Sequence, residues 1–169
     1  MPLRLAHTLL ILACALLLLG GWSWMGRAHS LTDAVPHNER LQCVSYSPFT
    51  RNQSPLDRPL RLDAGRMDAD LALLAQRFSC IRLYSMTGLE AIPQLARKHG
   101  LEVILGAWVN ANPRDTQKEI DLLIEAARAN PDVVRSVMVG NETLLRREIT
   151  ATQLARLIER VRESVPQPV

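Results

Sequence analysis

The sequence predicts an α/β fold in which four strand–helix units follow an apolar N-terminal segment. Short apolar runs centred near Val44, Arg82, Ile104 and Val137 alternate with stretches of helical periodicity. Strands that alternate with helices form a parallel sheet, because right-handed crossovers return each strand in the same direction. No Gly-rich dinucleotide motif or phosphate-binding loop follows the first strand, which disfavours a nucleotide-binding sheet.

The N-terminal segment is nearly continuously apolar from Leu9 to Met25. As a helix it is about 26 Å long, close to the thickness of a bilayer's hydrocarbon core. Trp22 and Trp24 lie where interfacial aromatic residues are expected. Because no clear small-residue cleavage site follows, residues 1–26 are predicted to be an uncleaved signal anchor rather than a removed signal peptide. We expect a membrane contact through residues 9–25, with the domain at the cell membrane on the exported side; the alternative is a secreted protein.

A polar linker is expected at residues 27–39, which contain Pro36 and show no periodicity. Residues 40–169 then form the domain. With 47% hydrophobic and 22% charged residues, the chain has enough core-forming residues for one folded domain.

The first two strand–helix units span roughly residues 41–100. The first strand is expected at Leu41–Tyr46 and its helix at about Arg66–Phe78, where apolar residues recur at helical spacing. The second strand is expected at Cys80–Tyr84. A capping box of Thr87 and Glu90 predicts the start of the following helix.

The third and fourth strands are expected at Glu102–Val109 and Val134–Glu142. Two further capping boxes predict the helices that follow them: Thr116 with Glu119, and Thr150 with Gln153. Pro166–Val169 lie where a fifth strand would begin.

Cysteine, histidine and charge patterns exclude several classes of function. Cys14, Cys43 and Cys80 show no zinc-binding spacing, so neither a metal site nor a cofactor is expected. Cys43 and Cys80 are predicted to be free buried thiols in neighbouring strands. No serine or cysteine nucleophile motif accompanies the histidines. The net charge is +3 without long basic runs, so no nucleic-acid partner is expected.

Polar and aromatic residues occupy the carboxyl ends of all four predicted strands. In a parallel sheet these ends meet on one rim. An aromatic-lined rim with an amide and a carboxylate suits a sugar, because sugar CH faces stack on rings and hydroxyls bond to polar groups. The candidate site residues are Tyr46, Tyr84, Trp108, Asn110, Asn141 and Glu142.

Glu142 is the most informative of these residues. A carboxylate beside a buried strand is costly unless it is partnered or functional. Its structural alternative is a helix N-cap, which is disfavoured because Thr150 is expected to open the next helix. For the others, Tyr46 and Tyr84 can equally be core tyrosines, and Asn110 can belong to a loop turn.

Four strand segments resemble glycoside hydrolase family 17, especially its bacterial members. These are related to β-1,3-glucanases and to the hydrolase-like modules of membrane-bound β-glucan synthases. The resemblance covers residues 41–169, and its segments are Val-Ser-Tyr-Ser-Pro-Phe, Ile-Arg-Leu-Tyr-Ser, Val-Ile-Leu-Gly-Ala-Trp and Val-Met-Val-Gly-Asn-Glu.

The resemblance implies a (β/α)8 TIM barrel and a retaining attack on β-glucosidic bonds. By matching position, Glu142 would be the general acid and base, and Asn141 would bond to the sugar 2-hydroxyl. Tyr46 and Tyr84 would line the subsite of the glucose unit being cleaved, with Trp108 and Asn110 near the cleft.

The family's nucleophile is a glutamate on a later strand, and no residue after Glu142 matches it. Residues 40–169 amount to about half of the ~250 residues of a complete barrel. We therefore expect the first four β/α units of the barrel and an incomplete site.

The expected function is hydrolysis of β-1,3-glucan or transglycosylation. The alternative is a membrane-tethered module that binds β-glucan or assists its synthesis without turnover. Expected partners are a β-glucan and either the remaining barrel half or a glucan synthase.

Overall fold

The computed structural model describes residues 2–28, 36, 39–55, 57 and 60–169. The chain divides into two units, Met1–Ala34 and Val35–Val169. Residues 29–35 and 37–38 of the expected linker lie outside the described residues.

The first unit contains one helix, α1 (Pro2–Met25), which begins before the apolar run predicted from the sequence. Within it, Arg4–Met25 is long and apolar enough to cross a membrane. The presence of an apolar N-terminal helix is therefore confirmed.

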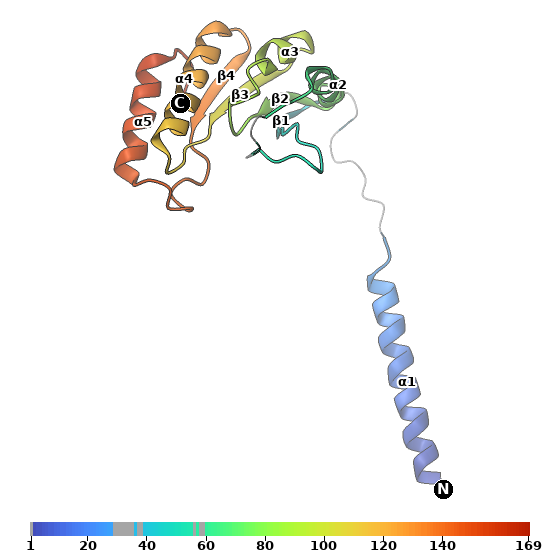
Figure 1. Ribbon diagram of the computed structural model, residues 1–169. Coiled ribbons are helices and arrows are strands. Elements are labelled where there is room, and N and C mark those ends of the chain that lie inside the picture. Colours follow the sequence, from blue (N-terminus) through green and yellow to red (C-terminus); the bar gives the residue numbers. More distant parts are fainter. Residues whose placement is uncertain (1, 29–35, 37–38, 56, 58–59) are drawn as a thin grey trace. The chain divides into compact units, whose positions relative to one another are not determined.

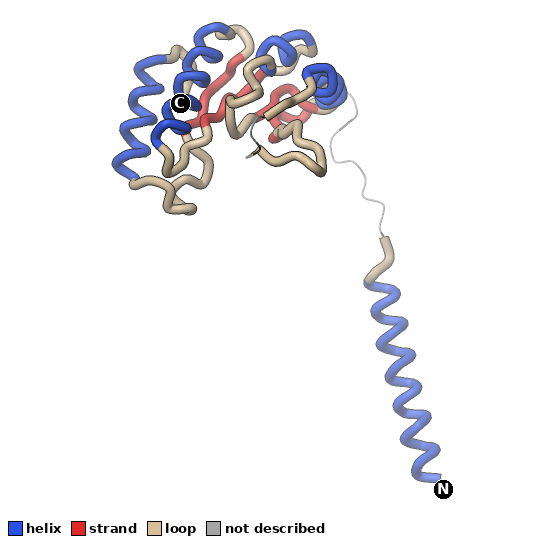
Figure 2. Tube along the Cα trace, in the orientation of Figure 1, coloured by secondary structure: helices blue, strands red, loops and turns tan. Residues whose placement is uncertain are grey.

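The second unit is built on a four-stranded parallel sheet in the order β1-β2-β3-β4. The strands are β1 (Leu41–Ser45), β2 (Phe78–Arg82), β3 (Glu102–Ala107) and β4 (Val134–Val139). The helices between and after them are α2 (Ala64–Leu74), α3 (Ile92–Lys98), α4 (Pro113–Ala129) and α5 (Ala151–Ser164). The predicted alternation of four strands and four helices is confirmed (Figures 1 and 2).

The hydrophobic core lies between the sheet and its helices. Alternate strand residues such as Ile81, Leu105 and Val137 point into it and are almost fully buried, as are Leu71 of α2 and Ile120 of α4. This period-two burial fixes which face each strand presents to the helices. The other strand residues, including Ser45 and Arg82, consequently lie on the opposite face of the sheet.

Several helix and strand boundaries differ from the sequence prediction. α2 begins at Ala64 because the side chain of Asp63 caps it, and it ends at Leu74. β2 begins at Phe78, which pairs with Leu41 of β1, and ends at Arg82. All four strands end before the candidate site residues, which therefore belong to the loops.

Only one of the three predicted capping boxes is confirmed, that of Thr150 and Gln153 at the start of α5. The side chain of Asn112, not Thr116, caps α4, and Ala91 precedes α3 without a side-chain cap. The boxes predicted at Thr87 and Thr116 are therefore wrong. Instead, Thr116 and Glu119 of α4 accept hydrogen bonds from the backbone N–H groups of Asn110 and Thr87, in the loops at the strand ends.

The prediction of free thiols at Cys43 and Cys80 is also wrong, because the two residues form a disulfide. They are direct partners in the β1–β2 register, with their Cα atoms 4.4 Å apart. This separation lies within the range that a disulfide can bridge.

Beyond α5 the chain returns to β4. The backbone N–H of Val137 donates to the carbonyl of Pro168 (2.9 Å), and Gln167 Nε2 donates to the carbonyl of Ala127 (2.8 Å). Residues 166–168 thus lie beside β4, where the sequence predicted the start of a further strand.

Candidate functional site

A cavity of about 530 Å³ lies at the carboxyl ends of the strands. All six residues predicted for the site line it: Tyr46, Tyr84, Trp108, Asn110, Asn141 and Glu142. The parallel sheet explains this convergence, since it places every strand's carboxyl end on the same rim. Arg82 and Glu119 also line the cavity, although the sequence did not mark either of them as a site residue.

Glu142 occupies a strained turn directly after β4. Gly140 has a φ of +80° and Glu142 a φ of +53°, a left-handed conformation that non-glycine residues rarely adopt. The Glu142 side chain is 63% exposed, and one carboxylate oxygen lies 4.0 Å from Arg146 Nη1. Because Thr150 caps α5, Glu142 is not a helix N-cap. Strain at a residue facing a cavity is a feature of functional sites.

Asn141 is held through both of its oxygen atoms. Arg82 Nη2 donates to the side-chain oxygen at 2.9 Å, and Arg146 Nη1 donates to the backbone carbonyl. The amide therefore has a defined orientation beside Glu142.

The two tyrosines are anchored in different ways. Tyr46 is buried, and its hydroxyl donates to the Asp70 carboxylate on α2 at 3.0 Å. Burial and this hydrogen bond raise the pKa of Tyr46. Tyr84 is only partly buried; its hydroxyl donates to Ser45 Oγ at 2.9 Å, and Arg82 lies 4.6 Å from its ring centroid. Tyr46 thus lines the cavity, as predicted, and is also the buried core tyrosine that was its structural alternative.

Trp108 and Asn110 belong to the loop between β3 and α4. The Arg146 guanidinium lies over the Trp108 ring, 4.2 Å from its centroid. The side-chain oxygen of Asn110 accepts from the Asn112 N–H at 2.8 Å. Asn110 therefore forms the loop turn that was its structural alternative, although it also lines the cavity.

Glu119 is the buried carboxylate that organises this rim. It is 5% exposed and accepts hydrogen bonds from the side chains of Ser85 and Thr87 and from the backbone N–H groups of Met86, Thr87 and Trp108. It thereby joins α4 to the loops that follow β2 and β3. Glu119 was predicted to belong to a capping box because it stands three residues after Thr116, and this spacing gives no sign of its bonds to the two loops.

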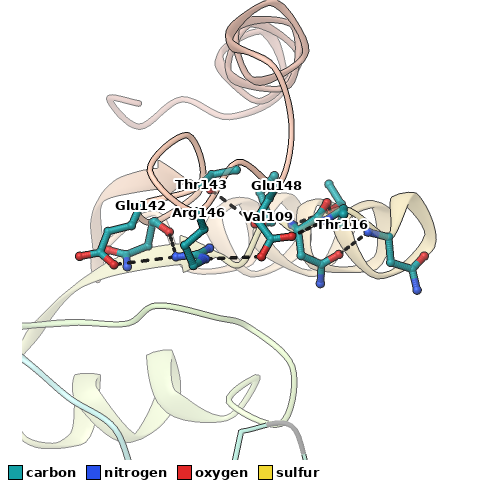
Figure 3. Close-up of polar contacts among 10 residues, drawn as sticks. Val109, Thr116, Glu142, Thr143, Arg146 and Glu148 are labelled. Atoms are coloured by element: carbon teal, nitrogen blue, oxygen red, sulfur yellow. Dashed lines mark hydrogen bonds and ion pairs between the residues drawn. The ribbon is translucent and has the colours of Figure 1, made fainter.

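Arg146 connects the loop after β4 with the loop after β3. Figure 3 shows its guanidinium between the carboxylates of Glu142 and Glu148. Arg146 Nε lies 3.5 Å from a Glu148 carboxylate oxygen. Glu148 in turn accepts from the backbone N–H of Ala111 at 2.9 Å. Nothing in the strand pattern marks Arg146, because it lies in an irregular loop.

Within the part of the chain that the structure describes, no group of three or more His, Cys, Asp or Glu side chains is placed to hold a metal ion.

The chain matches a known domain family. The profile of the BtgE/BtgC glycoside hydrolase domain matches residues 43–168. Among similar proteins, a glucan 1,3-beta-glucosidase of Arthroderma benhamiae is 28% identical over 108 residues, which are 62% of this chain and 35% of that protein. A probable beta-glucosidase btgE of Aspergillus flavus is 30% identical over 125 residues, which are 72% of this chain and 19% of that protein.

Among solved structures, the chain resembles a glycoside hydrolase family 17 beta-1,3-glucanosyltransferase from Rhizomucor miehei, with a TM-score of 0.57 and 24% identity. An active-site mutant of the Rhizomucor miehei beta-1,3-glucanosyltransferase, in complex with laminaritriose, gives a TM-score of 0.58 and 23% identity. Each match covers 72% of this chain and 44% of the solved one. The chain therefore spans less than half of these relatives, and the likeness shows that its parallel β/α units share their fold.

Proposed function

The chain belongs to the family of the BtgE/BtgC glycoside hydrolase domain, and from that premise we propose that its cavity is the acid/base side of a retaining site for β-1,3-glucan. One observation carries the proposal. Glu142, Asn141 and the aromatic residues Tyr84 and Trp108 line the same cavity, and Glu142 is held there in a strained conformation.

In this proposal Glu142 donates a proton to the leaving glycosidic oxygen and later removes one from the attacking water or sugar hydroxyl. Asn141 bonds to the sugar 2-hydroxyl. Tyr84 and Trp108 contribute stacking surfaces, and a sugar would use the face of Trp108 opposite Arg146. Tyr46 contributes its ring, since its hydroxyl is already bonded to Asp70.

A retaining mechanism also needs a carboxylate nucleophile about 5–5.5 Å from the acid. Among the described residues, the other carboxylates lining the cavity are Asp115 and Glu119. Glu119 is occupied by its backbone and hydroxyl donors, and Asp115 accepts from Asn112. The nucleophile of such a site is therefore a carboxylate that the described residues do not supply. The lack of a second available carboxylate among the described residues also favours a second candidate function. This is a module that binds glucan or assists a glucan synthase without turnover.

We further propose that α1 anchors the domain in a membrane, with the domain on the exported side. The span Arg4–Met25 has the length and apolar composition for this role. The disulfide between Cys43 and Cys80 supports an oxidising compartment, because such bonds are rare in a reducing cytosol.

The test measures laminaritriose binding and laminari-oligosaccharide products with the whole chain in detergent micelles. Glu142→Gln should keep binding and abolish any turnover, because it is similar in shape but cannot transfer the proton. Trp108→Ala should weaken binding about tenfold through lost stacking. Glu102→Gln is the matched control, since Glu102 is exposed at the amino end of β3, away from the cavity lining.

Binding without any product from the unmodified chain would favour the second candidate. Absence of laminaritriose binding would contradict both candidates. Unchanged turnover in Glu142→Gln would remove Glu142 from the acid role.

A further inference from the structure

The neighbouring Arg82 guanidinium determines which way the Asn141 side-chain amide is turned. Arg82 Nη2 lies 2.9 Å from the atom assigned as Asn141 Oδ1. A guanidinium has only donors, so the amide atom facing it must be the oxygen. Among the hydrogen bonds of the described residues, none uses Asn141 Nδ2. Since Asn141 lines the cavity, this amide nitrogen is the group it has left for a ligand.

Arg82 is itself held in place from the side opposite β4. Its guanidinium lies over the Tyr84 ring, and Tyr84 is fixed by its hydrogen bond to Ser45 at the end of β1. Ser45, Tyr84, Arg82 and Asn141 thus form a continuous chain of contacts from β1 to the loop after β4. In this series of contacts Arg82 donates a hydrogen bond to Asn141. Arg82 Nε is buried and has no hydrogen-bond partner among the described residues.

The Asn141 backbone adds to this arrangement. Its carbonyl accepts from Arg146 Nη1, so two different guanidinium groups occupy the two oxygens of one residue. Both Asn141 oxygens therefore already accept a hydrogen bond from a guanidinium, whereas Nδ2 has no partner among the described residues.

We propose that Arg82 is a positioning residue that turns the Asn141 amide so that Nδ2 donates to the substrate. This inference rests on the proposed function. It adds a direction to the contact: the sugar hydroxyl must accept the hydrogen bond from Asn141. Substrate binding then requires a hydrogen-bond acceptor on the sugar opposite Asn141 Nδ2. It also requires Arg82, even though Arg82 need not touch the sugar.

The decisive variant is Asn141→Asp. Aspartate has nearly the same shape and keeps an acceptor for Arg82, but it replaces the N–H donor with a second acceptor oxygen. We expect laminaritriose to bind the whole chain in micelles at least fivefold more weakly, with an undiminished melting temperature because the contact with Arg82 becomes an ion pair.

Arg82→Met tests the positioning role, because it keeps an unbranched apolar stem and removes the donor. It should weaken laminaritriose binding severalfold and shift the Asn141 side-chain NH₂ resonances in a nitrogen-15 NMR spectrum. In an Asn141→Ala background the same change should have no further effect on binding, since Arg82 acts through Asn141. Arg82→Lys, which restores a cationic donor, should recover part of the affinity. Arg135→Met, at an exposed arginine of β4, is the matched control.

If the unmodified chain binds laminaritriose and Asn141→Asp binds it equally well, the donor role is wrong while the proposed function stands. If Arg82→Met weakens binding equally in both backgrounds, Arg82 does not act through Asn141. If the unmodified chain does not bind laminaritriose, the proposed function fails and this inference fails with it.

Discussion

The two rims of the sheet use the same residue types in opposite ways. At the amino-end rim, Arg97 pairs with Asp132 at 2.7 Å and Arg135 pairs with Glu102 at 3.5 Å. These side chains are between 41% and 58% exposed. Such solvent-exposed ion pairs contribute little to stability, because water and salt screen them.

At the carboxyl-end rim, the arginines lie over aromatic rings and bond to an amide or a backbone carbonyl. Its central carboxylate, Glu119, is buried and fully bonded, whereas Glu102 on the other rim is exposed. Charged side chains at the amino-end rim are therefore exposed surface groups, whereas those at the carboxyl-end rim fix the positions of the residues that line the cavity. Both non-glycine residues with positive φ among those described, Glu142 and Arg147, also belong to the carboxyl-end rim.

The largest expected contrast between the rims is in their carboxylates. Glu119→Ala should lower the free energy of unfolding by about 3 kcal/mol, because it leaves several buried donors of two loops without an acceptor. Glu102→Ala, the matched change on the other rim, should lower it by less than about 0.5 kcal/mol. Urea unfolding followed by circular dichroism measures both. Equal effects would show that Glu119 does not organise its rim.

A second contrast appears in alkali. The chain has two tyrosines, Tyr46 and Tyr84, and both lie on the carboxyl-end rim. Burial and the Asp70 hydrogen bond raise the pKa of Tyr46 in the folded state, whereas in the unfolded chain tyrosine ionises near pH 10. Above about pH 10 the unfolded state therefore binds fewer protons, and stability should fall by about 1.4 kcal/mol per pH unit.

Tyr46→Phe should remove this alkaline loss of stability, while Tyr84→Phe, the control, should keep it because Tyr46 is still present. Urea unfolding at a series of pH values from 8 upward makes the comparison. An unchanged alkaline slope in Tyr46→Phe would argue against the buried, bonded hydroxyl.

The smallest effect concerns backbone strain. Glycine adopts positive φ without steric cost, so Glu142→Gly and Arg147→Gly should each raise the free energy of unfolding by about 0.5–1 kcal/mol. Thermal unfolding measures the gain. The two variants should then differ in function: Glu142→Gly should lose any turnover, whereas Arg147→Gly should retain it, since Arg147 does not line the cavity. Loss of stability in both variants would mean that the positive φ is not a source of strain.

Much of the fold is predictable because hydrophobic periodicity determines it. The alternation around Ile81, Leu105 and Val137 encodes parallel strands with one face against helices, and parallel strands bring their carboxyl ends together. This is why residues as distant as Tyr46 and Glu142 could be assigned to one rim from the sequence.

The parts that sequence did not reveal depend on contacts between distant segments. The Cys43–Cys80 disulfide depends on the exact β1–β2 register, which apolar patterning alone does not set. Glu119 stands three residues after Thr116, as in a capping box, yet it bonds to the loops after β2 and β3. Arg146 acts from an irregular loop, where no periodicity applies.

The most direct test of the glucan site is the map of amide chemical-shift changes when laminaritriose is added to the nitrogen-15-labelled chain in micelles. Shifts should concentrate at the carboxyl-end rim, around Tyr84, Trp108, Asn141 and Glu142, and leave Arg97, Glu102 and Asp132 on the other rim unchanged. Shifts confined to the amino-end rim, or none at saturating laminaritriose, would contradict a glucan site at the strand ends.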